Sequence, residues 1–332
     1  MGNTSLHYLL RSGKNSKALY YLRAVLLDML PDSLFRKRLK NELETCRQLY
    51  DEEYVADRVN YYCKTPASND ELYPDITLKR IGDFHRKGHS SMYYYDSREV
   101  LRWFNHDLCW HYLFGDIREI PPYPTIVKSR STQVDNTNSV LLKLNRNRHF
   151  VFVRDKIPFE QKKDQAIFRG QVGTRHNRQL FINRFSGNSR VDAANTLAKG
   201  GLLATNPDKH PTSPRLSIYD HLKYRYIMAL EGNDVASNLK WVMSSNSLAV
   251  SPPLTCETWF MEGRLKAGVH YVGIRDDFED LEEKMDYYST HTNEAQEIIH
   301  NANQWTTQFK NTRRERYISL LVMLKYFKLY AL

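Results

Sequence analysis

Residues 166–178 read A-I-F-R-G-Q-V-G-T-R-H-N-R, an apolar run that ends at Arg169 and Gly170 and is followed by Gly173. Glycine lets the backbone turn tightly and approach a ligand closely, and arginine offers a fork of donors that matches phosphate oxygens. The pattern predicts an anion-binding turn, with phosphate as the expected anion. The spacing fits neither a Walker loop nor G-x-G-x-x-G, so a surface turn with solvated arginines is the alternative.

The composition indicates a soluble globular protein with an anionic partner. The chain has 332 residues, enough for two domains of ordinary size, and 26% of them are charged. Its formal net charge of +10 indicates nucleic acid, a membrane surface or phosphorylated substrates, and charge alone does not choose among these three.

The cysteines and the chain start predict a reducing, cytoplasmic location. The four cysteines are scattered and form no C-x-x-C pair, so neither a zinc knuckle nor a redox motif is indicated. The N-terminal sequence lacks the pattern of a signal peptide, and no window reaches the roughly 18 apolar residues of a membrane span.

Both ends of the chain are predicted to be helical. Leucines at positions 19, 22, 26, 27 and 30 recur at helical spacing, and residues 16–62 are expected to form an amphipathic hairpin with a solvated charged face. Residues 313–332 are basic and then strongly apolar. We expect a helix packed on the body there, with a membrane-surface helix as the alternative.

From residue 120 onward, strand and helix patterns alternate, which predicts an α/β architecture with a largely parallel sheet. Strands are expected at 125–127, 150–153, 247–250 and 269–274, and helices at 179–197, 235–243, 276–288 and 293–309. The polar loop 128–139 is a second functional candidate, because functional groups sit on loops at strand ends. The helix expected after Gly232 would offer its N-terminus to an anion.

Several segments, in this order, resemble glycosyltransferase family 90. They are Phe168-Arg169-Gly170 with Thr174 and Arg178, His221-x-Lys223-Tyr224-x-Tyr226, Gly232 with Ser237 and Lys240, Ser247, Glu257-x-Trp259-Phe260, and Val269-His270-Tyr271 with Asp277 and Leu281. The resemblance covers roughly residues 125–305. Lys128-Ser129-Arg130, Asn138-Ser139 and Arg148-His149-Phe150 look like its bacterial lipopolysaccharide-modifying branch.

The resemblance implies a GT-B fold, in which two Rossmann-like domains face a cleft, here with a helical N-terminal part and a C-terminal helix. The expected domains are 1–155 on the acceptor side, 156–310 for the nucleotide-sugar, and 311–332 as the helix. It also implies inverting, metal-independent transfer of a glucose or related sugar from a UDP-sugar, without a further cofactor. The sequence contains no D-x-D motif for a divalent ion.

The resemblance also supplies roles for individual residues. A departing nucleoside diphosphate gains negative charge, which cationic side chains and backbone N–H groups must stabilise when no metal does. Arg169 is expected to act in catalysis, and Glu257 to hold ribose hydroxyls. Where animal members carry an arginine, this chain has Asn238. The expected donor-binding residues are Arg169, Gly170, Thr174, Arg178, Lys223, Tyr224, Gly232, Ser237, Asn238, Lys240, Ser247 and Glu257.

An inverting transferase needs a general base for the acceptor hydroxyl. Animal members place an aspartate after an arginine that matches Arg130, whereas Ser131 follows here. Asp135 is the expected base and Asp155 the second choice, with a turn-forming role as the alternative for Asp135.

The expected acceptor is lipopolysaccharide or another envelope glycan at the inner face of the inner membrane, with an anionic membrane surface as a further candidate partner. One competing hypothesis is a family member that has lost catalysis and only binds. Another is a basic nucleic-acid-binding protein. Acidic residues are interspersed with the basic ones throughout, which disfavours nucleic acid as a partner.

Overall fold

The computed structural model describes residues 12–64, 78–196 and 212–329. They belong to two compact units, which we treat separately. The sheet unit contains the chain up to residue 15 together with 148–254 and 264–308, and the helical unit contains 16–147, 255–263 and 309–332. The sequence predicted domain limits at 155 and 310, and did not predict that 255–263 joins the helical unit.

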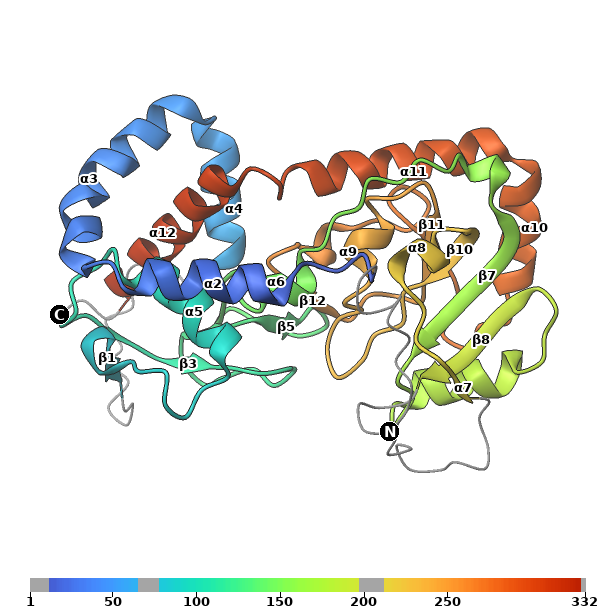
Figure 1. Ribbon diagram of the computed structural model, residues 1–332, viewed down its shortest axis with the longest axis horizontal. Helices are drawn as coiled ribbons and strands as arrows, with labels where there is room; N and C mark the ends of the chain where they lie inside the picture. The colour runs from blue at the N-terminus through green and yellow to red at the C-terminus, as the bar shows by residue number, and fades with distance from the viewer. Residues whose placement is uncertain (1–11, 65–77, 197–211, 330–332) are drawn as a thin grey trace. The chain divides into compact units, whose positions relative to one another are not determined.

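A six-stranded parallel sheet forms the centre of the sheet unit (Figure 1). Its order, β13-β11-β10-β7-β8-β9, is the 3-2-1-4-5-6 order of the Rossmann fold. The predicted α/β class with a parallel sheet is therefore confirmed, and the GT-B arrangement of two domains stays a prediction. The strands are β7 (Lys163–Gly170), β8 (Val191–Thr196), β9 (Thr212–Ser213), β10 (Tyr224–Met228), β11 (Leu248–Ser251) and β13 (Val272–Gly273).

Helices pack on this sheet through an apolar core. α7 (His176–Phe185) packs against β8, α10 (Leu281–Thr290) against β7, and α11 (Thr292–Thr307) against β11. Phe168 of β7 meets Phe181 of α7 edge to face, and both are buried. Burying such side chains stabilises the unit and fixes β7 at its centre. Short elements complete it: α8 (Ile218–His221), α9 (Leu239–Val242) and η2 (Phe159–Gln161).

The helical unit combines five longer helices with small sheets. β3, β4 and β6 form a parallel sheet, β5 pairs with β12 and β1 with β2, both antiparallel. The helices are α2 (Lys17–Asp28), α3 (Asp32–Leu49), α4 (Glu52–Tyr62), α5 (Ser91–Leu101) and α12 (Thr312–Lys328). The other elements of this unit are β1 (Lys79–Arg80), η1 (Ile81–Asp83), β2 (Cys109–Trp110), β3 (Tyr112–Leu113), β4 (Thr125–Val127), β5 (Ser129–Ser131), β6 (Ser139–Leu141) and β12 (Cys256–Thr258). The short elements α6 (Arg146–His149) and η3 (Glu262–Arg264) cross the limits of the two units in the sequence.

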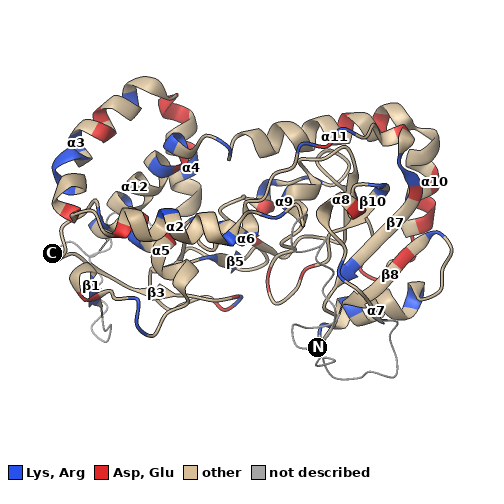
Figure 2. Ribbon diagram, in the orientation of Figure 1, with Lys and Arg blue, Asp and Glu red and all other residues tan. Residues whose placement is uncertain are grey.

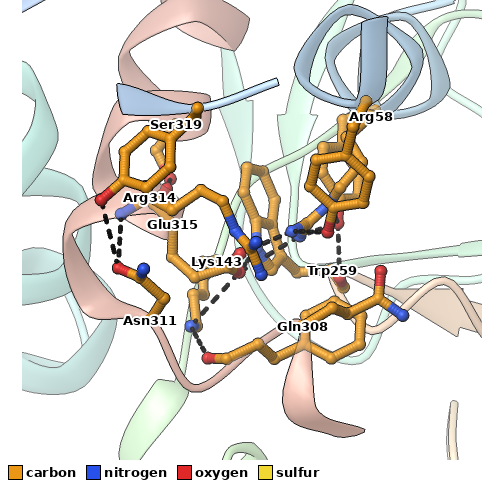
Figure 3. Close-up of polar contacts among 12 residues, drawn as sticks. Arg58, Lys143, Trp259, Gln308, Asn311, Arg314, Glu315 and Ser319 are labelled. Atoms are coloured by element: carbon orange, nitrogen blue, oxygen red, sulfur yellow. Dashed lines mark hydrogen bonds and ion pairs between the residues drawn. The ribbon is translucent and has the colours of Figure 1, made fainter. Parts of the chain in front are cut away.

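A buried carboxylate ties the elements of the helical unit together (Figure 3). Glu315 of α12 accepts hydrogen bonds from both terminal nitrogens of Arg58, at 2.5 and 3.1 Å, and from the indole N–H of Trp259 at 2.6 Å. Lys143 lies 3.5 Å from the same carboxylate. These cations hold the pKa of Glu315 below its usual range although burial opposes them. The network joins α4, α12 and the loop after β12.

The predicted strand at 150–153 is wrong, because its backbone groups find side-chain partners in place of a neighbouring strand. The N–H of Val153 donates to Ser244 Oγ at 2.9 Å, and the carbonyl of Phe150 accepts from Asn15 Nδ2 at 3.1 Å. These partners lie 91 and 135 positions away in the sequence, so the local pattern of residues 150–153 does not reveal them.

The predicted helix at 179–197 is correct only in its first part. Helix α7 ends at Phe185, and Gly187 follows with a φ of +78°, a conformation in which a helix cannot continue. Asn188 Oδ1 then accepts from the backbone N–H of Val191, where β8 begins. The turn chemistry of residues 186–188 thus replaces the second half of the predicted helix with a strand.

The helix predicted at 235–243 is a single turn, Leu239–Val242. Asn238 precedes it and makes no side-chain cap; its side-chain Nδ2 donates to the carbonyl of Met228 at 2.9 Å. A helix this short does not supply the N-terminal anion site that the sequence predicted after Gly232.

Candidate active site at the carboxyl ends of β7 and β10

The strand order places a switch point between β7 and β10. From β7 the chain goes to β8 and β9 on one side, and it returns to β10 on the other side. In open parallel sheets, ligands bind in the crevice outside the carboxyl ends of the strands at such a point. The loops that follow Gly170 of β7 and Met228 of β10 share one partner, Arg178, which donates to a carbonyl of each loop.

The turn after β7 uses its glycines as the sequence predicted. A Cβ on Gly170 would lie 2.8 Å from Phe168 Cζ, so a side chain there would force the buried Phe168 ring to move. Gly173 has a φ of +56°, in the left-handed region that favours glycine. Thr174 follows it and is exposed. The strand thus leads into a tight turn directly before α7.

Arg178, in the first turn of α7, connects the two loops. Its Nη1 donates to the carbonyl of Gln171 at 2.8 Å, its Nη2 to that of Leu230 at 2.8 Å and its Nε to that of Glu231 at 3.1 Å. A Cβ on Gly232 would lie 3.2 Å from Arg178 Nη2, so glycine there lets the loop approach the guanidinium. Main-chain carbonyls therefore position Arg178 without neutralising its charge.

Two further arginines lie near Arg178. Burial, followed by the charges of Arg175 and Arg148, lowers the pKa of Arg178 to about 10. Within the described part of the chain, none of the three forms an ion pair with a carboxylate, and Arg175 Nε is buried without a hydrogen-bond partner. We call Arg148, Arg175 and Arg178 the arginine cluster. Uncompensated positive charge of this kind favours an anion, and the donors suit phosphate oxygens.

Arg169, which the sequence predicted to act in catalysis, makes its contacts with β8 and not with the arginine cluster. Its Nη2 pairs with Asp192 Oδ1 at 2.5 Å, and its Nη1 donates to the carbonyl of Asp192 at 2.7 Å. The Tyr224 hydroxyl donates to Asp192 Oδ2 at 2.9 Å. Burial and Asp192 together raise the pKa of Tyr224 to about 12, so its phenol stays protonated. Arg169 and Tyr224 thus share a carboxylate of β8.

Lys223 and Ser247 lie at the amino ends of the strands, whereas the arginine cluster lies at their carboxyl ends. Lys223 directly precedes β10 and pairs with Asp220 at 2.8 Å on the surface. Ser247 directly precedes β11, and its buried hydroxyl donates to the carbonyl of Tyr224, the first residue of β10, at 2.8 Å. The structure therefore brings these residues to the amino ends of the strands, while Gly170, Thr174, Arg178 and Gly232 lie at the carboxyl ends.

The loop after β10 holds the other predicted donor-binding residues. Ser237 and Asn238 are half-buried. Lys240 on α9 is fully buried, and its Nζ lies 6.0 Å from the centre of the Phe150 ring. Lys240 therefore has no solvent-exposed surface in this structure.

Glu257 belongs to the helical unit. Its carboxylate is buried, accepts from Arg130 Nε at 2.7 Å and from the hydroxyl of Tyr61, and lies on β12, which pairs with β5. Gly263 allows this packing, because a Cβ there would lie 2.8 Å from Glu257 Oε2. Arg130 and Glu257, both part of the resemblance, thus form an ion pair within one unit.

The two candidate bases differ in environment. Asp135 is exposed, and its Oδ1 accepts from the backbone N–H of Thr137 at 3.0 Å and from its hydroxyl at 2.6 Å. These bonds lower the pKa of Asp135 and give it the turn-forming role that the sequence left open. Asp155, the second choice, is buried and pairs with Lys162 at 2.7 Å.

Neither a metal cluster nor a membrane span is found among the described residues. In 12–64, 78–196 and 212–329, no three His, Cys, Asp or Glu side chains are grouped to hold a metal ion. Over the same ranges, no helix has the length and hydropathy needed to cross a bilayer.

The sequence analysis missed Arg148 and Arg175 as members of the site. Arg175 stands within the quoted stretch, between two positions that received a role. Arg148 was named only as part of the resemblance to the bacterial branch of the family, without a role in the site. Its proximity to Arg178 depends on how the loop before β7 folds, which no local pattern reveals.

The description "Glycosyl transferase family 90" belongs to the family model that matches residues 142–331. The chain is 41% identical to O-glucosyltransferase LpsA of Dichelobacter nodosus over 315 residues, which is 94% of this chain and 96% of that protein. It is 25% identical to protein O-glucosyltransferase 1 of Rattus norvegicus over 150 residues, 45% of this chain and 38% of that one. It is 26% identical to O-glucosyltransferase rumi of Drosophila pseudoobscura pseudoobscura over 144 residues, 43% and 35% respectively.

Proposed function

Because the chain belongs to glycosyltransferase family 90 and is a glycosyltransferase, we propose that it transfers a sugar from a UDP-sugar, glucose being the first candidate, to lipopolysaccharide or another envelope glycan. The proposal includes inversion at the anomeric carbon and no required metal. The relatives bear on the sugar through their printed names, which are those of O-glucosyltransferases. The name LpsA and the net charge of +10 favour an anionic envelope glycan as acceptor.

The arginine cluster is the observation on which the donor site rests. Its three guanidinium groups lie at the switch point of a Rossmann-type sheet, without a carboxylate partner in the described part of the chain. A diphosphate supplies the negative charge that the cluster lacks. We assign the diphosphate of the donor to Arg175 and Arg178, with Gly170, Thr174 and Gly232 as the backbone that approaches it.

The role of the arginine cluster in sugar transfer follows from the negative charge that UDP gains as it leaves. The acceptor oxygen forms a bond to the anomeric carbon as the bond from that carbon to the phosphate oxygen breaks, and UDP departs with one more negative charge. Preorganised guanidinium groups stabilise this charge without reorganising. The proton of the acceptor hydroxyl goes to a carboxylate, for which Asp135 remains our candidate. Its exposure leaves it open to an acceptor, although its lowered pKa makes it a weak base in this conformation.

Release of UDP from UDP-glucose by the purified protein, with a lipopolysaccharide acceptor, tests the proposal. The variant Arg175→Ala is suited to it, because the side chain makes one long hydrogen bond, 3.4 Å to the carbonyl of Val172. We expect kcat/KM to fall about 100-fold, the usual effect of removing one donor that stabilises developing charge. Arg184→Ala, in the last turn of the same helix, is the matched control and should keep full activity.

Each outcome has a distinct meaning. Unchanged turnover in Arg175→Ala would show that the diphosphate does not bind at the cluster. UDP binding without turnover, across a panel of UDP-sugars and glycan acceptors, would favour the catalytically inactive alternative. If the protein bound another nucleotide in preference to UDP, the UDP-sugar donor would be wrong, but the diphosphate site at the arginine cluster would still hold.

A further inference from the structure

The first described helix, α2, presents its apolar side to solvent. Leu19, Leu22 and Leu26 recur at helical spacing on one side of α2, and Met29 and Leu30 follow directly after its last residue. Their exposed fractions run from 44% at Leu30 to 76% at Met29. We call these five residues the α2 leucine face. The expectation that residues 16–62 form an amphipathic hairpin with a solvated charged face is therefore wrong for α2, whose exposed side is apolar. Large apolar side chains that are exposed side by side mark interaction sites.

The opposite side of α2 is fixed to the helical unit, so the leucine face cannot simply turn inward. The Tyr20 hydroxyl donates to Asp96 Oδ1 on α5 at 2.8 Å, and Ala24 is buried. At the end of α2, Arg102 Nη2 donates to the carbonyl of Leu30 at 2.6 Å and to Asp32 at 3.0 Å. These bonds hold the helix by its polar side and leave the apolar side outward.

Basic residues outnumber acidic residues in the sequence on both sides of the leucine face. Residues 12–40 contain seven lysines and arginines against two acids, Asp28 and Asp32. Both acids are paired with Arg98, at 3.2 and 2.6 Å, so their charge is compensated. Figure 2 shows Lys and Arg on α3. The exposed basic residues of this stretch that belong to the helical unit are Lys17, Arg23, Arg36, Lys37, Arg38 and Lys40.

We propose that the α2 leucine face, with these basic residues, docks on an anionic lipid surface. An amphipathic helix lies in the bilayer interface with its apolar side among the acyl chains, and lysine and arginine reach the headgroups. A second copy of the chain fits less well, because pairing two leucine faces would also bring together two sets of like charges. Charge complementarity therefore selects the lipid surface as the occupant.

The C-terminal helix, for which the sequence left a membrane role open, does not offer such a face. Ile318, Leu320, Val322, Met323 and Phe327 of α12 are buried. They pack within the helical unit against α4, α3 and α5. The membrane-contacting element inferred from the structure is thus α2.

Vesicle co-sedimentation of the full chain tests the proposal. We expect binding to vesicles of phosphatidylcholine mixed with phosphatidylglycerol, weak binding to phosphatidylcholine alone, and loss of binding as salt rises. Leu26→Asp should weaken binding about tenfold or more, since it removes one inserted leucine and adds a like charge to the lipid. Leu49→Asp is the matched control, because Leu49 and Leu26 are both 57% exposed on helices and Leu49 lies outside the leucine face.

Three results would overturn the inference. The first is equal vesicle binding by the parent protein and Leu26→Asp when both have the same melting temperature. The second is equal binding to neutral and anionic vesicles. The third is a change from dimer to monomer in Leu26→Asp by light scattering with no vesicle binding in either protein, which would assign the face to a second copy.

Discussion

Replacing Gly232 by alanine is the smallest change that should disturb the arginine cluster. The added Cβ would lie 3.2 Å from Arg178 Nη2, closer than the 3.4–4 Å of ordinary contact, and 3.6 Å from Arg175 Nε. Gly232 does not adopt a positive φ, so alanine is compatible with the backbone there. The strain therefore falls on the contact with Arg178, whose guanidinium must move by a few tenths of an ångström.

The size of the effect follows from what holds Arg178. Its three hydrogen bonds to carbonyls, of 2.8, 2.8 and 3.1 Å, resist the movement. Weakening one charge-assisted bond to the protein or to a bound phosphate costs about 1.5 kcal/mol. That energy corresponds to roughly a tenfold loss of affinity. We expect Gly232→Ala to bind UDP about tenfold more weakly in isothermal titration calorimetry, with less than about 1 kcal/mol lost in unfolding free energy.

Gly82→Ala is the control for adding a methyl group. Gly82 also lacks a positive φ, and its Cβ would meet His106 only at 3.4 Å. UDP affinity in this variant should equal that of the parent. If Gly232→Ala bound UDP as tightly as the parent, the diphosphate could not depend on the position of Arg178, and the assignment of the donor site would fail.

Three further predictions concern stability and catalysis. Glu315→Gln, which leaves Arg58 buried without a carboxylate, should lower the unfolding free energy by about 3–5 kcal/mol in urea titration, whereas exposed Glu44→Gln should change it little. Burial raises the pKa of Asp96 from 3.8 to about 6, so the folded chain binds the carboxyl proton more tightly than the unfolded chain. The stabilisation that this proton contributes is full below pH 3.8 and is lost as pH rises through about 6. The stability of the parent relative to Asp96→Asn should therefore fall by about 2 kcal/mol between pH 4 and 7, and a constant difference would contradict the shift. Asp135→Asn should abolish sugar transfer and retain UDP binding; retained transfer would place the base elsewhere.

The sequence predicted those parts of the candidate site whose backbone conformation depends on neighbouring residues. An apolar run closed by Gly170 and Gly173 predicted the turn after β7, because tight turns need those backbone conformations. The parallel sheet followed from alternating patterns. The prediction of a helix over 235–243 was correct only for the single turn Leu239–Val242, which has no side-chain cap at Asn238.

The remaining features depend on contacts between distant residues. Arg169, which stays a predicted catalytic residue, pairs with Asp192, which follows it by 23 positions and becomes its neighbour only when β8 joins β7. Glu257 was expected near the nucleotide and is paired with Arg130 across 127 positions. The exposed leucines of α2 likewise result from the anchoring of Tyr20, 76 positions from Asp96. Periodicity identifies an apolar side of a helix and does not say what covers it.

The hydrogen bonds of Arg178 also determine when the site can form during folding. Its partners Leu230 and Glu231 lie 52 and 53 positions further along the chain. The intervening residues must complete β8 and β9 and cross back before β10 can dock beside β7. Contacts of such sequence separation form slowly, since loop closure precedes any gain from them. Competence to bind an anion is therefore acquired late, and nucleotide binding would report that the whole sheet has assembled.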